Sequence, residues 1–168
     1  NTSSEADLTM VGGQLKALVD ATSPKVTITA YNDLPAGQLG LAQMWSGDII
    51  NAQAYLPEGT GPEVLRYWFP SDGKGMVDND MLKGGKIPVL AHLFLGHMLD
   101  SEVAMQNFSA IGYQPPQNSI NPDSLISDGF IPENLSAAIV RPEWFDAGYR
   151  VLELDPTNDA AWQNVWRT

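Results

Sequence analysis

Two short acidic segments carry the residue types best suited to chemistry. The first is Gln43–Asp48, in which Trp45 is followed by a Ser-Gly break and then by Asp48. The second is Gly75–Asp78, which ends on Asp78. An aromatic ring and a carboxylate together suit an organic cation, because the ring face attracts the charge and the carboxylate accepts its N–H donors. In the structural alternative, Trp45 belongs to the core and Asp48 only caps the following helix.

The composition limits the classes of partner. The chain has 168 residues, enough for one domain with a core, and 43% of them are hydrophobic. Its net charge is −11, with nine Lys plus Arg, which argues against nucleic-acid binding because that needs a dense basic patch. The acidity favours a cationic ligand or serves solubility alone. Cysteine is absent, so disulfides, thiol nucleophiles and thiolate metal sites are excluded.

Motifs for catalysis and for metal binding are missing from the sequence. It has no G-x-S-x-G nucleophile elbow, no P-loop and no H-E-x-x-H motif. His92 and His97 lie five positions apart, so they do not share a helix face as two metal ligands would. Asp78 and Asp80 alternate along one segment, but nothing nearby supports acid–base work. We therefore expect no enzyme, no catalytic residues, no cofactor and no metal.

Strands and helices must position the acidic segments, and the hydrophobic spacing predicts both. Alternating apolar residues predict strands over 25–31, 41–45, 64–69 and 76–82. Helical spacing and end signals predict helices from a capping Ser3 or Ser4 to Val19, and then over 33–41, 48–55, 88–99, 101–112, 132–139 and from 156 or 159 to 166. Strands alternate with helices early and helices dominate late, which indicates the α/β class.

Further segments extend this order along the chain. The full series is Trp45-Ser46-Gly47-Asp48, Pro70-Ser71-Asp72-Gly73, Met76-Val77-Asp78, the helix break Leu99-Asp100-Ser101-Glu102, and Ile111-Gly112-Tyr113. In this order and spacing the series resembles the second half of an extracytoplasmic solute-binding protein of an ABC importer, of the spermidine/putrescine-binding branch. The resemblance runs from about Asn1 to Tyr113 and resumes weakly at Trp162–Trp166.

The resemblance implies a particular fold. It is the periplasmic-binding-protein-like fold of type II, in which two α/β lobes close on the ligand like a hinge. Residues 1–45 would form part of one lobe and residues 46–168 part of the other. Members of the family are considerably longer, so the resemblance also implies that only the C-terminal half is present. Each lobe would then expose apolar edges, and we expect homo-oligomers by dimerisation or exchange of elements.

The resemblance also implies a ligand site. Trp45 would stack on the ligand, Asp48 and Asp78 would pair with its ammonium groups, and Tyr113 would contribute from the rim. Met76 lies in the same site, at a position where the family usually carries an aromatic residue.

The implied ligand is a polyamine such as spermidine or putrescine, and the implied partners are ABC permease subunits. The implied location is extracytoplasmic, in the periplasm or as a cell-surface lipoprotein, with the signal sequence not in this chain. The alternative is an α/β interaction or regulatory domain that has no small-molecule ligand.

Overall fold

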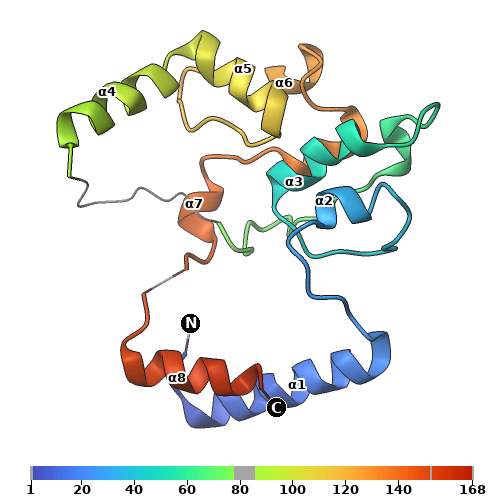
Figure 1. Cartoon of the computed structure of the whole chain (residues 1–168), viewed down its shortest axis with the longest axis vertical. Helices are drawn as coiled ribbons and strands as arrows, with labels where there is room; N and C mark the ends of the chain where they lie inside the picture. Colours follow the sequence, from blue (N-terminus) through green and yellow to red (C-terminus); the bar gives the residue numbers. More distant parts are fainter. Residues whose placement is uncertain (1, 78–85, 152, 168) are drawn as a thin grey trace. The chain divides into compact units, whose positions relative to one another are not determined.

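The computed structural model of the chain describes residues 2–77, 86–151 and 153–167 (Figure 1). It is 52% helical and 1% strand, and the described residues contain no sheet. The predicted α/β class is therefore wrong, and so is the periplasmic-binding-protein-like fold.

The first predicted strand shows why the prediction failed. Residues 25–28 have no regular structure, and Val26 and Ile28 leave 90% and 93% of their surfaces exposed. Alternating apolar residues give a segment a face that a sheet can bury. A strand also needs a neighbour for its backbone N–H and C=O groups, so β propensity depends strongly on context. Within the described residues this segment has no neighbouring strand.

The remaining predicted strands do not form in the described part of the chain either. Residues 41–45 and 65–69 are irregular. The β-type pairing that the structure does describe is an isolated parallel bridge between Met76 and Tyr149. The predicted strand over 76–82 lies mostly outside the described residues.

The chain divides into two compact units. The terminal unit comprises Asn1–Ile28 and Arg150–Thr168, and the central unit comprises Thr29–Tyr149. The lobe boundary expected after Trp45 falls inside the central unit.

The terminal unit is a pair of packed helices, α1 (Glu5–Thr22) and α8 (Pro156–Val165). Ser4 caps α1 as predicted, because its side chain accepts a hydrogen bond from the backbone N–H of Asp7. The indole Nε1 of Trp162 donates to the backbone carbonyl of Thr2 at 3.0 Å. Both helices were predicted from their spacing and end signals, and both predictions are confirmed.

The central unit is built from short helices joined by irregular segments. Its elements are α2 (Ala30–Asp33), α3 (Ser46–Asn51), η1 (Ala52–Tyr55), η2 (Pro62–Val64), α4 (Pro88–Met98), α5 (Ser101–Ile111), α6 (Ser124–Ser127), η3 (Glu133–Ala138) and α7 (Trp144–Ala147).

The helix predictions for the central unit are mostly confirmed. Those over 48–55, 88–99, 101–112 and 132–139 are matched by α3 with η1, α4, α5 and η3. The helix predicted over 33–41 is wrong, because α2 ends at Asp33.

The core of the central unit lies where α3 packs against η3 and α5 (Figure 1). Ile49 and Ile50 contribute from α3, Phe108 from α5 and Leu135 from η3, and all four are buried. Their burial fixes α3 relative to α5 because packed apolar side chains tolerate little displacement. The beginning of α3 is thereby held next to the end of α5.

Candidate functional site

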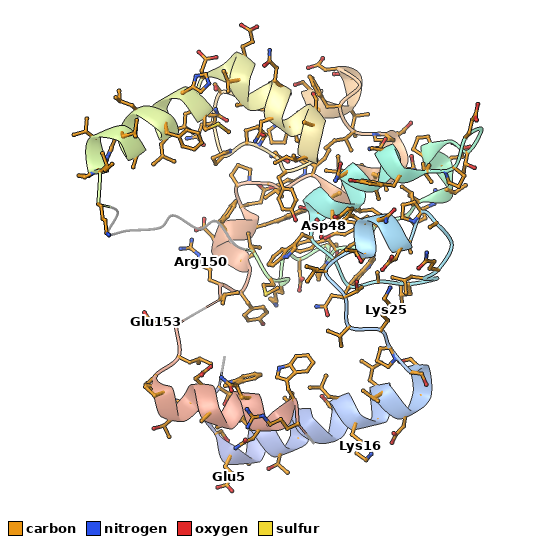
Figure 2. All side chains as sticks on the ribbon, in the orientation of Figure 1. Glu5, Lys16, Lys25, Asp48, Arg150 and Glu153 are labelled. Carbon is orange, nitrogen blue, oxygen red and sulfur yellow. The ribbon has the colours of Figure 1, made fainter. Side chains whose placement is uncertain are left out.

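Asp48 lies in the first turn of α3 (Figure 2). The residue that caps this helix is Trp45, whose backbone carbonyl accepts from the N–H of Asp48 at 3.1 Å. Asp48 is half-buried, and a carboxylate in a first turn is favoured by the positive end of the helix dipole. The structural alternative, in which Asp48 is the N-cap of α3, is therefore wrong. The side chain of Asp48 is available for other partners.

The partner of Asp48 is Tyr113, 65 positions further along the chain. The Tyr113 hydroxyl donates to Oδ1 of Asp48 at 2.7 Å. Tyr113 directly follows Gly112, which ends α5 in the left-handed conformation at φ 77°. Two residues of the predicted ligand site are thus in direct contact.

Two glycines make this contact possible. A side chain at Gly112 would collide with the backbone carbonyl of Gly47 and, at 2.7 Å, with the backbone nitrogen of Asn51. A side chain at Gly47 would overlap the ring of Tyr113. The sequence suggested that Gly47 permits a tight turn. In the structure it lies within the first turn of α3, where it leaves room for the Tyr113 ring.

A second phenol belongs to the same cluster. Burial raises the pKa of Tyr67, and the negative charge of Asp48 raises it further. Burial likewise raises the pKa of Tyr113, and the hydrogen bond to Asp48 adds to that effect. Tyr67 also donates a long hydrogen bond, 3.4 Å, to the backbone carbonyl of Met44. One carboxylate and two phenols therefore share one electrostatic environment.

Tyr67 was not predicted as a site residue. The sequence placed it in a strand with Trp68 and Phe69, where at least one ring was expected in the core. Its only signal was that aromatic triplet, which does not indicate which ring faces a carboxylate.

The negative charge of Asp48 is not balanced by a basic side chain within the described part of the chain. The ion pairs found there include Lys16–Asp20, Lys74–Asp72 and Arg141–Asp123. Asp48 has a neutral phenol as its partner instead. A carboxylate keeps further acceptor positions after one hydrogen bond, so Asp48 can also accept from a cation.

The other predicted site residues are placed differently. Trp45, three positions before Asp48, is 42% exposed, and Tyr113 is 44% exposed, so neither ring is in the core. Met76 is half-exposed and pairs through its backbone with Tyr149. Asp78 lies outside the described residues.

A groove lies beside the contact between α3 and α5. Its volume is about 250 Å³, and it is lined by residues that include Asn51, Ala54, Phe108, Gly112 and Phe130. Pockets for small ligands are usually larger, about 300–1,000 Å³. The lining of this groove does not include the Asp48–Tyr113 pair, which lies at the surface with Asp48 half-buried and Tyr113 44% exposed. Among the described residues no group of three or more His, Asp or Glu side chains is arranged to hold a metal.

The comparisons with known proteins give no relative. No family model, no curated protein and no solved structure matches the chain. In the described part of the chain, no helix combines the length and apolar character that crossing a membrane requires.

Proposed function

We propose that this chain is a non-enzymatic binding component that captures a small organic cation, with a polyamine such as spermidine or putrescine as the first candidate. The cation would be delivered to an ABC permease, which implies an extracytoplasmic location. The observation that carries the proposal is the 2.7 Å hydrogen bond from Tyr113 to Asp48. It joins two residues that the family resemblance independently assigns to a ligand site. The two-lobed fold of that family is not part of the proposal.

The site has the chemistry that an ammonium group requires. Asp48 provides a carboxylate whose charge no described basic side chain balances. Tyr113, whose residue is 44% exposed, contacts Asp48 directly, and Trp45, which is 42% exposed, lies three positions before Asp48 in the sequence. Aromatic rings attract cations through the negative charge of their faces, and a charged acceptor roughly doubles the strength of a hydrogen bond. The net charge of −11 adds long-range attraction for a cation.

The first test compares spermidine binding by the chain and by two single variants, using calorimetric titration at low salt. Asp48→Asn keeps the shape but removes the charge, so the dissociation constant should rise about 10–100-fold. The matched control is Asp20→Asn on α1, which makes the same change in net charge and should alter the constant less than about twofold. Equal effects of the two variants would reject the site.

The neutral side of the pair is tested by Tyr113→Phe. This variant keeps the ring and removes one hydroxyl, so a loss of only several-fold in spermidine affinity is expected.

The salt dependence of binding tests the ion pair. Trp45 and Tyr113 are nearly half-exposed, so salt ions can reach the site, and high salt should weaken spermidine binding by the unchanged chain. Spermidine binding that salt does not affect would contradict an ion-pairing site.

The geometry can be checked without a ligand, through the titration of Tyr113. Its pKa is raised above the ordinary value of about 10 by burial and by its hydrogen bond to Asp48. Because the folded-state pKa is the higher one, the neutral phenol stabilises the fold fully below pH ~10. This stabilisation is lost as the pH rises through the folded-state pKa.

Phenolate absorbance should therefore show late-titrating tyrosines, with one fewer in Tyr113→Phe and with a shift to lower pH in Asp48→Asn. An unchanged titration in Asp48→Asn would mean that the two residues are not partners. This measurement separates a wrong geometry from a wrong ligand.

A further inference from the structure

Helix α4 is the most apolar exposed element of the structure. Residues 87–99 contain no Asp, Glu, Lys or Arg, and no residue of α4 is buried. Five large apolar side chains are each between 59% and 71% exposed: Ile87, Val89, Leu90, Leu93 and Phe94. Soluble proteins rarely leave such a continuous apolar surface in water, and a patch of this kind marks an interaction site.

These five side chains, four on one side of α4 and Ile87 at its N-cap, are here called the α4 face. Leu90 and Phe94 are four positions apart, Val89 and Leu93 form the adjoining row, and Ile87 is the N-cap residue just before the helix. Gly96 continues that side, and a side chain there would meet nothing within 4 Å. A second helix could therefore approach closely at this end of the α4 face.

The size of the α4 face suits a protein partner. With roughly 200 Å² for a whole large side chain, the five residues leave on the order of 600 Å² in water. A stable interface buries about 800 Å² of each partner. The α4 face with its immediate surroundings therefore supplies nearly the area that one such interface needs.

We propose that two copies of this chain associate through their α4 faces, with the helices antiparallel and a two-fold axis near Leu93. Such an interface is self-complementary, because each copy presents the same surface to the other. The proposal does not depend on the ligand site, which lies on α3 and at the end of α5.

The charges around α4 identify a second copy as the partner. With a net charge of −11, two copies repel one another over most of their surfaces, whereas the α4 face brings no acid against another. Lys86 precedes α4 and Asp100 follows it, seven positions on either side of Leu93. An antiparallel pair sets Lys86 of each copy near Asp100 of the other, which is an attractive arrangement. An anionic lipid surface would instead repel the chain.

The oligomeric state is the direct test. Light scattering on the full chain should show a concentration-dependent rise from the 18.3 kDa monomer towards twice that mass. Leu93→Glu places two like charges at the axis and should raise the dimer dissociation constant more than about 100-fold. The matched control is Leu41→Glu, since Leu41 is almost fully exposed outside α4, and it should leave association unchanged.

The orientation is tested by cross-linking, for which the absence of cysteine is convenient. Leu93→Cys should form a disulfide-linked dimer on copper-phenanthroline oxidation, because the two copies of residue 93 meet at the axis. Lys86→Cys should not, since an antiparallel pair separates the two copies of residue 86 by about 20 Å along the helices, well beyond disulfide reach. Leu41→Cys provides the background level of random cross-linking.

Three results would overturn the proposal. A strict monomer at high concentration removes it altogether, and a dimer that Leu93→Glu does not weaken places the interface elsewhere. Efficient cross-linking of Lys86→Cys would show a parallel pair. Binding to vesicles of zwitterionic lipid is measured for the unchanged chain and for Leu93→Glu. If the unchanged chain is a monomer that binds the vesicles and Leu93→Glu does not bind them, α4 is a lipid-binding surface and the dimer proposal is overturned.

Discussion

Helices α4 and α5 follow one another in the chain and have the same length, 11 residues, yet they are used in opposite ways. Helix α5 mixes polar and apolar residues, and its apolar side buries Ala104 and Phe108. Helix α4 is far more apolar, yet none of its residues is buried.

The difference shows that apolar content alone does not decide burial. A helix packs into a core when its apolar residues form one stripe that faces that core. Helix α5 has such a stripe, and in addition its ends are fixed by the side chain of Asp100 and by Gly112. Helix α4 has apolar residues on several sides and no side-chain cap, so most of its surface stays open to a partner.

The difference in packing between α5 and α4 is tested most strongly at Phe108, which is buried in the core. Phe108→Ala should lower the free energy of unfolding by about 3–5 kcal/mol, because it leaves a cavity that the surrounding helices cannot fill. This change in the free energy of unfolding is measured by urea denaturation at a protein concentration too low for dimers to form. A loss under about 1 kcal/mol would mean that α5 is no better packed than α4.

Gly112 tests the anchored end of α5. Gly112→Ala forces a side chain into the left-handed region and against the backbone of Gly47 and Asn51, so we expect a loss of about 2–4 kcal/mol. The matched control is Gly13→Ala within α1, where an added side chain meets nothing and should stabilise by about 0.5–1 kcal/mol. Equal responses would show that α3 and α5 do not meet as described.

Asp100 tests the other end of α5. Its side chain accepts from the backbone N–H groups of Glu102 and Val103 at 3.0 and 3.3 Å. Asp100→Ala should therefore cost about 1 kcal/mol in urea denaturation. Asp100→Asn keeps an acceptor oxygen and should lose much less. If both variants behave alike, the cap does not explain why α5 is the better anchored helix.

The smallest effect on folding is expected at Phe94 of the α4 face. Phe94→Ala should change the free energy of unfolding of the monomer by less than about 0.5 kcal/mol, since the ring is mostly exposed. The same variant should weaken dimerisation in light scattering, because an aromatic ring would leave the interface. A large loss of monomer stability would reveal that α4 is packed within its own chain.

The sequence predicted the helices better than the rest of the fold because helix ends depend on near neighbours. Ser4, Pro88, Asp100 and Gly112 stand at the ends where capping chemistry expects them. Strands depend on partners elsewhere in the chain. The alternating residues around Val26 predicted a strand but did not indicate a partner strand for it. Strand predictions of this kind led to the wrong α/β class.

The candidate site was predicted only in part, because some of its residues act through contacts that exist only in the folded chain. The resemblance singled out Trp45, Asp48 and Tyr113, and the structure joins the last two by a hydrogen bond. Tyr67 could not be found in this way, because its effect on the site arises only from its position near Asp48 in space. The role of Gly47 was equally hidden, since it depends on a ring 66 positions away.

The two glycines that let Tyr113 reach Asp48 also determine how the site can be re-engineered. Gly47 and Gly112 admit no side chain, so they form a constant frame. Asp48 is half-buried and Tyr113 is 44% exposed, so we expect substitutions at these two positions to disturb the backbone less than substitutions at the glycines. A library that varies these two positions, with both glycines kept, would sample new ligand preferences at little risk to folding. Randomising the glycines would mostly return chains that no longer hold the two groups together.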